Sequence, residues 1–303
     1  MKRIFRWALW GGAALVCFLV LLVAAFFFVQ PRHYTGFVEQ QIVSAAQRSK
    51  IGLRIGGTEL SPWAFRAHNV QMLLPRMLFP INIERIEVVP RLLSLLGRVP
   101  HVSLGGALYG GTMQGDLGYA IDGSGGNLNF ALKDFDLSSF PPLAGFGIRA
   151  GKLGAQLSDG RFTSGGSSQA EITLDLSNVE KPQSSAFALA SFNLPFNVEI
   201  PAFSNLNSEL KATLQGPELL VKSWSLRSSL GDARCTARVV FDQRGKPRDW
   251  NLDGTVELTA EGSRVFGLYL PLLSNQSLDS TVQRFRIAAR GGLGLPEAKF
   301  SRL

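Results

Sequence analysis

The sequence predicts a mainly β protein in which an N-terminal transmembrane helix and a short amphipathic helix precede a twisted antiparallel sheet. Three observations support this fold class. One long, uncharged apolar segment lies near the N-terminus, and later segments alternate between apolar and polar side chains. Glycine (32 residues) and proline (15 residues) are frequent, and charged residues make up only 18% of the chain. This composition favours short strands and turns over long exposed helices.

The N-terminal segment is expected to anchor the chain in a membrane. Residues 7–29 carry no charge and follow Lys2, Arg3 and Arg6. A span of about 20 apolar residues crosses a hydrocarbon core of about 30 Å, whereas a cleaved signal has only about 7–15. The basic residues favour a cytoplasmic N-terminus, residues 1–6, and export of the rest. The expected anchor residues are Trp7, Trp10, Leu15, Leu19, Leu22, Phe26 and Val29.

A cleaved signal peptide is the alternative interpretation of this segment. Residues 26–31 offer no small-x-small cleavage site, so an uncleaved anchor is preferred. The two cysteines support no disulfide, because Cys17 lies in the apolar span and Cys235 in a predicted strand.

The exported part begins with a juxtamembrane region, residues 30–50. A helix is predicted over residues 35–48, where Val38, Ile42 and Ala45 recur on one face, with Thr35 as its N-cap. Residues 51–290 are expected to form one β-rich domain, and the glycine-containing residues 291–303 a flexible tail.

The alternating segments predict strands with one apolar and one polar face. They cover residues 127–133, 171–176, 192–200, 234–241, 250–260 and 285–290. A hairpin is predicted between two earlier strands, with Gly110 and Gly111 in its turn. Pro195 and Pro201 lack the N–H of a ladder, so their segment is expected at a sheet edge or bulge.

The apolar strand faces must be shielded from water, and the sequence pattern is compatible with two arrangements. The sheet either curls into a sandwich or barrel, which is the favoured expectation, or stays open as an apolar groove for acyl chains or a protein partner. The candidate residues of such a groove or partner face are Phe192, Leu194, Phe196, Val198, Ile200, Trp250, Leu252, Val256 and Leu258.

The sequence contains no motif that predicts catalysis or a cofactor. It lacks G-x-S-x-G, H-E-x-x-H and the P-loop pattern. His33, His68 and His101 lie at no metal-ligand spacing, and the pair Asp134 and Asp136 is interpreted as a solvated turn. The expected protein is therefore non-enzymatic, with no catalytic residue, metal or cofactor. An anchored hydrolase is the disfavoured alternative.

The net charge of +8 invites comparison with nucleic-acid-binding proteins. The lysines and arginines are scattered without a dense run. This distribution favours a mild attraction to anionic lipid headgroups, and no nucleic-acid partner is expected.

Several short motifs carry a family resemblance. They are GTEL at 57–60, RLLSLL at 91–96, VSLGGALYGGTMQG at 102–115, FDLSSFPPL at 135–143 and GKLG at 151–154. Together with the signal anchor, this layout resembles the type II secretion system protein N family, which is similar to the broader AsmA-like group.

The resemblance implies an inner-membrane-anchored periplasmic component of a Gram-negative type II secretion system. In that role the sheet would bind an envelope partner protein. The AsmA-like relatives imply an alternative, a twisted sheet whose apolar groove binds or transfers lipids through their acyl chains. Neither group implies a catalytic site.

Overall fold

The computed structural model describes residues 32–48, 50–61, 63–74, 79–91, 94, 97–163, 168–188, 197–242, 247–266, 284–291 and 297–303. The chain divides into two compact units, Met1–Pro90 and Arg91–Leu303. The predicted membrane span, residues 7–29, lies outside the described residues together with all of its anchor side chains. Among the residues that are described, no helix is long and apolar enough to cross a membrane.

The first unit packs one helix against a small sheet. Helix α2 (Arg32–Arg48) contacts strands β1 (Gly52–Arg54) and β2 (Gly57–Leu60). Strand β3 (Phe65–Leu73) pairs antiparallel with β1, β2 and β4 (Ile81–Pro90). The predicted helix is therefore confirmed, but it begins before Thr35, which is consequently not its N-cap. Among the described residues of this unit, the buried apolar ones are Ala64, Ala67, Val70 and Ile83.

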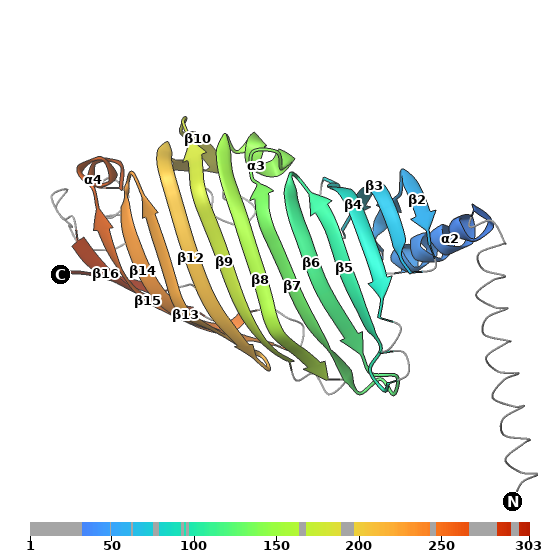
Figure 1. Ribbon diagram of the computed structural model, residues 1–303. Helices are drawn as coiled ribbons and strands as arrows, with labels where there is room; N and C mark the ends of the chain where they lie inside the picture. Colours follow the sequence, from blue (N-terminus) through green and yellow to red (C-terminus); the bar gives the residue numbers. More distant parts are fainter. Residues whose placement is uncertain are drawn as a thin grey trace, which may run out of the picture. The chain divides into compact units, whose positions relative to one another are not determined.

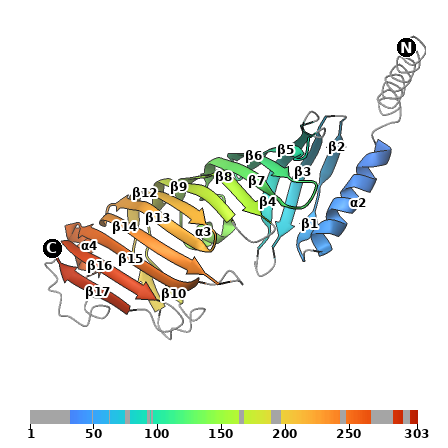
Figure 2. The ribbon, with the colours of Figure 1, turned by 90° about the horizontal axis from the view of Figure 1, so that it is seen from below.

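The second unit is built on a long sheet in which all neighbouring strands are antiparallel. In Figures 1 and 2 its strands turn progressively, as the right-handed twist of strands requires. In their order across the sheet, the strands are β5 (His101–Leu108), β6 (Gly111–Tyr119), β7 (Gly125–Asp136), β8 (Ala150–Thr163), β9 (Ser168–Lys181), β12 (Phe203–Gln215), β13 (Glu218–Ser228), β14 (Gly231–Phe241), β15 (Pro247–Leu258), β16 (Arg284–Gly291) and β17 (Glu297–Arg302).

This sheet is not closed, because β5 and β17, the first and last strands of the second unit, do not pair with each other. The favoured expectation of a sheet that curls and covers itself is therefore wrong. The mainly β, antiparallel character of the prediction is confirmed.

Short elements lie along one edge of this sheet, the edge at which β7, β9 and β15 end, which we call the upper edge. They are α3 (Pro141–Gly145), α4 (Ala260–Phe266) and a hairpin of β10 (Ser185–Ala188) and β11 (Asn197–Ile200). Figure 1 shows all three at the top of the sheet. The hairpin forms a separate two-stranded sheet.

The predicted hairpin at residue 110 exists, but its turn is shifted by one residue. Leu108 pairs with Gly111, so the central residues are Tyr109 and Gly110, both with positive φ (47° and 72°). Two positive φ values define a type I′ turn. Gly111 begins β6 instead, where an added Cβ would lie 2.6 Å from the Lys133 carbonyl oxygen.

The C-terminal residues also differ from the prediction of a flexible tail. Residues 297–302 form strand β17, which pairs with β16. Phe300 is buried against Phe285 and Leu258, with 6.1 Å between the two phenyl centroids. Burial of this aromatic side chain holds the last strand on the sheet.

Candidate functional site

The strand register places apolar residues in continuous rows across the second unit. Paired residues of antiparallel strands carry their side chains on the same face of a sheet. The central row contains no charged or hydroxyl side chain. From β5 to β17 it comprises Gly106, Met113, Leu132, Ala155, Leu174, Leu210, Trp224, Cys235, Gly254, Ile287 and Phe300.

Two further rows flank the central one on the same face. One comprises Leu104, Gly115, Phe130, Leu157, Ile172, Ala212, Val221, Ala237, Leu252 and Ala289. The other, nearer the upper edge, comprises Phe135, Leu153, Leu176, Ser208, Leu226, Ala233, Val256 and Phe285. We call these three rows the apolar face. Its one hydroxyl side chain is Ser208, whose Oγ accepts a hydrogen bond from Trp224 Nε1 (2.9 Å).

The opposite face of the sheet carries charge. The residues that precede or follow the apolar-face residues along each strand lie on this opposite side. Some of them form ion pairs between neighbouring strands, for example Lys152 with Asp134 (3.2 Å). Arg286 donates two hydrogen bonds to the Asp253 carboxylate, which hold the pKa of that carboxyl below its ordinary value. These pairs are solvent-exposed, so each adds little to stability. They show which side of the sheet faces water.

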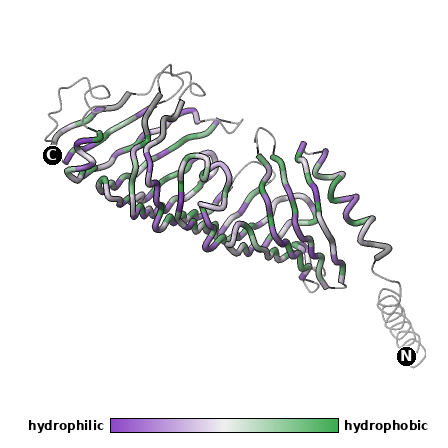
Figure 3. Tube along the Cα trace, turned by 90° about the horizontal axis from the view of Figure 1, so that it is seen from above, coloured by the Kyte–Doolittle hydropathy of each residue, from purple (hydrophilic) through white to green (hydrophobic). Residues whose placement is uncertain are grey.

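The apolar face is only partly buried. Leu174 is 37% and Trp224 36% exposed, and most other members of the three rows are half-buried. In Figure 3 hydrophobic and hydrophilic residues alternate along the strands of this unit. Apart from the short β10–β11 hairpin at the upper edge, the described part of the chain supplies no second sheet to cover this face.

The face deepens into a cavity at the upper edge. This cavity has a volume of about 390 Å³ and an almost wholly apolar lining. The end of the β10–β11 hairpin and α4 both contribute to it, together with strands of the main sheet. Its apolar lining residues include Ile200, Pro201, Phe203, Leu206, Leu226, Leu230, Val256, Leu258 and Phe266.

The sequence-predicted groove residues divide into four groups. Leu252 and Val256 lie in the apolar face, and Trp250 shares its side of β15, two and six residues from them at strand period two. Ile200 and Leu258 line the cavity. Val198 lies in β11 of the separate hairpin, so residues 197–200 are not part of a long strand of the main sheet. Phe192, Leu194 and Phe196 lie outside the described residues.

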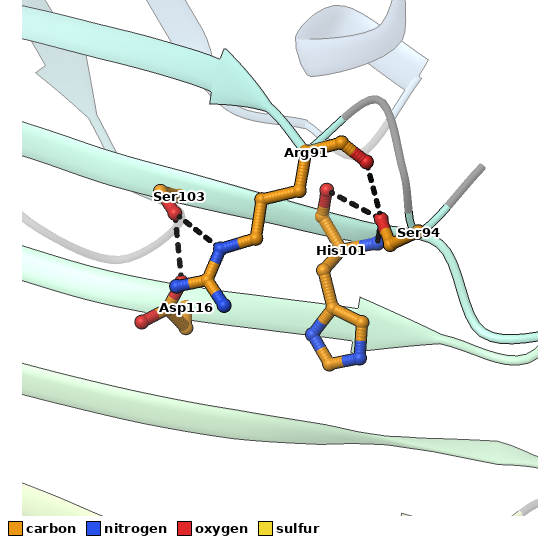
Figure 4. A network of polar contacts seen from close by, with 5 residues as sticks. All are labelled: Arg91, Ser94, His101, Ser103 and Asp116. Carbon is orange, nitrogen blue, oxygen red and sulfur yellow. Dashed lines mark hydrogen bonds and ion pairs between the residues drawn. The ribbon is translucent and has the colours of Figure 1, made fainter. Parts of the chain in front are cut away.

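A polar cluster near the lower edge, at the start of β5, has the residue types of a catalytic triad but another geometry. Arg91 Nε donates to Ser103 Oγ (3.0 Å), and Arg91 also pairs with Asp116. His101 takes part only through its backbone, donating to Ser94 Oγ (2.7 Å). In Figure 4 the imidazole ring makes none of the contacts drawn. No histidine base is aligned on a serine in this cluster, which fixes the Arg91–His101 connection instead.

The predicted acidic pair does not share a site. Asp134 pairs with Lys152, whereas Asp136 accepts hydrogen bonds from the hydroxyls of Ser138 (2.7 Å) and Ser139 (2.8 Å). These bonds lower the pKa of Asp136. Within the described ranges, no group of three histidine, cysteine or acidic residues could hold a metal ion.

Cys235 offers a chemical probe in the middle of the apolar face. Burial raises the pKa of its thiol above the ordinary value, so less thiolate forms at a given pH. In a Cys17→Ser chain, we expect iodoacetamide to react more slowly with folded protein than with urea-unfolded protein. The midpoint of the rate–pH profile should also lie at a higher pH for the folded than for the unfolded protein, because burial raises the thiol pKa. Equal folded and unfolded rates would contradict this environment.

The comparisons with known proteins identify no relative of this chain. No family model, no curated protein and no solved structure matches this chain. The resemblance to the secretion family therefore stays a prediction from the sequence motifs.

Proposed function

We propose that the protein is a membrane-anchored lipid-binding protein, whose second unit holds acyl chains against the apolar face. The observation that carries this proposal is the central row, which is apolar without interruption from β5 to β17, together with its two flanking rows on a sheet that is not closed. Apolar surface in contact with water costs about 25 cal/mol per Å². A continuous half-exposed face of this kind is typical of a binding surface.

The dimensions of the face suit long hydrocarbon ligands. Adjacent strands lie about 4.8 Å apart, so the rows extend for about 50 Å. One leaflet of a bilayer has a hydrocarbon depth of about 15 Å, half of the total core. The face would therefore accommodate lipids one after another, and a chain moving along it would meet Ser208 as the single hydroxyl group.

The two faces of the sheet would have separate tasks. Acyl chains would displace water from the apolar face, while the charged opposite face stays hydrated. Polar lipid headgroups would extend past the strand ends into water, because the rows themselves offer them no ion partner. Residues 7–29 are proposed to keep this surface close to the membrane that supplies the lipid.

Lipid extraction tests the proposal directly. The full chain should be purified in a mild detergent, exchanged into a lipid-free detergent and analysed by mass spectrometry after solvent extraction. We expect phospholipid to remain with the protein in at least equimolar amount. A detergent-matched anchored protein with a closed domain provides the background value. Lipid at that background level would reject the proposal.

A role in type II secretion is the second proposal, and it rests on the sequence resemblance alone. In that role a protein partner would cover the same apolar face. Loss of secretion of a folded exoprotein after gene deletion, without retained lipid in the purified protein, would favour this alternative.

A further inference from the structure

Two β-bulges lie on either side of β9 and β12, in the flanking strands β8 and β13. In β8, the register with β9 shifts between Ser158 and Arg161. In β13, Lys222 is the extra residue, because its two neighbours pair with consecutive residues of β12. A bulge turns side chains out of the regular alternation, and bulges are frequent beside functional sites. The two bulges therefore mark this part of the charged face for closer inspection.

A cavity of about 410 Å³ is lined by both bulges and by the strands between them. Its side chains belong to the charged face, because Glu171 and Thr213 are register partners that adjoin Ile172 and Ala212 of the apolar face. The lining is mainly polar and includes Asp159, Arg161, Gln169, Glu171, Gln215 and Lys222. A volume of a few hundred Å³ is typical of small-molecule sites.

The bulge in β8 presents an anion and a cation to this cavity. Asp159 has a positive φ of 52°, and its backbone N–H donates to Asn129 Oδ1 (3.0 Å), which fixes the bulge. Neither Asp159 nor Arg161 forms an ion pair with another described residue, whereas Glu171 pairs with Lys222 (3.7 Å). Asp159 and Arg161 thus leave two opposite charges available to a ligand.

Thr213 adds a buried hydroxyl to the same lining. The residue is 7% exposed, and its Oγ1 has no hydrogen-bond partner in the described part of the chain. Buried polar side-chain atoms ordinarily have a partner. A hydrogen-bonding group that enters the cavity would supply one.

We propose that this cavity binds a zwitterion of the phosphoethanolamine type, with its ammonium group at Asp159 and its phosphate at Arg161. Two positions along a strand span about 6.6 Å, which suits opposite charges joined by a short linker. A guanidinium group can donate two parallel hydrogen bonds to a phosphate. The four ionic side chains of the lining carry no net charge, which favours a zwitterion over a simple anion or cation. The site lies opposite the apolar face and does not depend on acyl-chain binding.

Saturation-transfer NMR with glycerophosphoethanolamine tests the site on the full chain in detergent. Asp159→Asn should weaken binding about tenfold, the usual effect of losing a charged hydrogen bond. Asparagine tolerates positive φ, so the bulge should persist. Asp134→Asn is the matched control, because Asp134 has a φ of 57° on the same face but lies outside the cavity lining. Its affinity should equal that of the unsubstituted protein.

Separate halves of the ligand test the two assigned charges. Glycerol 3-phosphate lacks the ammonium group, so its weaker binding should fall with Arg161→Gln and not respond to Asp159→Asn. Ethanolamine should show the opposite pattern. Arg149→Gln, just before β8, provides the control for Arg161→Gln and should leave both affinities unchanged. Absence of glycerophosphoethanolamine binding, or equal weakening by Asp159→Asn and Asp134→Asn, would overturn the proposal.

Extracted lipid identifies the source of the bound group. If it is a lipid headgroup, co-purified phospholipid should be enriched in ethanolamine over the whole-membrane extract, and Asp159→Asn should abolish the enrichment. Glycerophosphoethanolamine binding without such enrichment assigns a free solute instead. Retained lipid without glycerophosphoethanolamine binding rejects only this site. Glycerophosphoethanolamine binding without retained lipid rejects only the acyl-chain function.

Discussion

Leu174→Asp is expected to lower the amount of co-purified lipid about tenfold or more. Leu174 lies in the central row of the apolar face, paired with Ala155 and Leu210. A carboxylate there would have to lose water when an acyl chain covers it, at a cost of several kcal/mol. Each increment of about 1.4 kcal/mol changes an affinity about tenfold. Mass spectrometry of extracted lipid, normalised to protein, measures the effect.

Thr173→Asp provides the matched control. It introduces the same side chain in the same strand, one residue away and on the charged face, where Lys211 is its register partner. Both substitutions carry the same low strand propensity, and Leu174 is 37% exposed, so neither should unfold the sheet. Equal lipid content in the two variants would show that the apolar face does not hold the lipid.

Phe135→Ala is expected to destabilise the second unit strongly. Phe135 is 7% exposed, and its ring meets Tyr109 edge-on at 5.3 Å and Phe140 at 5.8 Å between centroids. Removing a buried phenyl group costs about 3–5 kcal/mol. For a unit of this size that corresponds to a fall in Tm of about 6 °C or more. Thermal unfolding followed by circular dichroism of the detergent-solubilised chain measures the shift.

Phe146→Ala removes the same side chain at a position that is 40% exposed, directly after α3. Its effect should stay below about 1 kcal/mol, because much of the lost contact area already faces water. A Tm for Phe135→Ala equal to that of Phe146→Ala would mean that the aromatic cluster at the upper edge does not stabilise the sheet.

Period-two alternation was a reliable signal wherever it was regular. Residues 171–176, 234–241 and 250–258 lie in β9, β14 and β15. A strand with one solvated and one apolar face requires apolar side chains at every second residue. Strand β8 escaped prediction although Leu153, Ala155 and Leu157 alternate within it. Its several glycines resemble turn residues, and the bulge at Asp159, with φ 52°, breaks the pattern.

The residues of the candidate site were only partly accessible from the sequence. Leu252, Val256, Leu258 and Ile200 could be named because they alternate in short segments. Leu174, Leu210 and Trp224 belong to one row only through the register of β9, β12 and β13. The number of residues between two strands does not determine their register, because hydrogen bonding between the strands and β-bulges determine it. The burial of Lys181 in the structure carried no signal either, because a lysine in a sequence is ordinarily exposed.

The sequence by itself determined that this chain forms antiparallel strands with one apolar and one charged face, because side chains alternate locally along a strand. It also predicted the helix that became α2. Only the tertiary structure decided that the sheet stays open and that its apolar residues join in rows. It also placed the last residues in β17 and the base of the hairpin in the wall of a cavity. Closure and register depend on how twist and bulges accumulate over many strands, which no local pattern records.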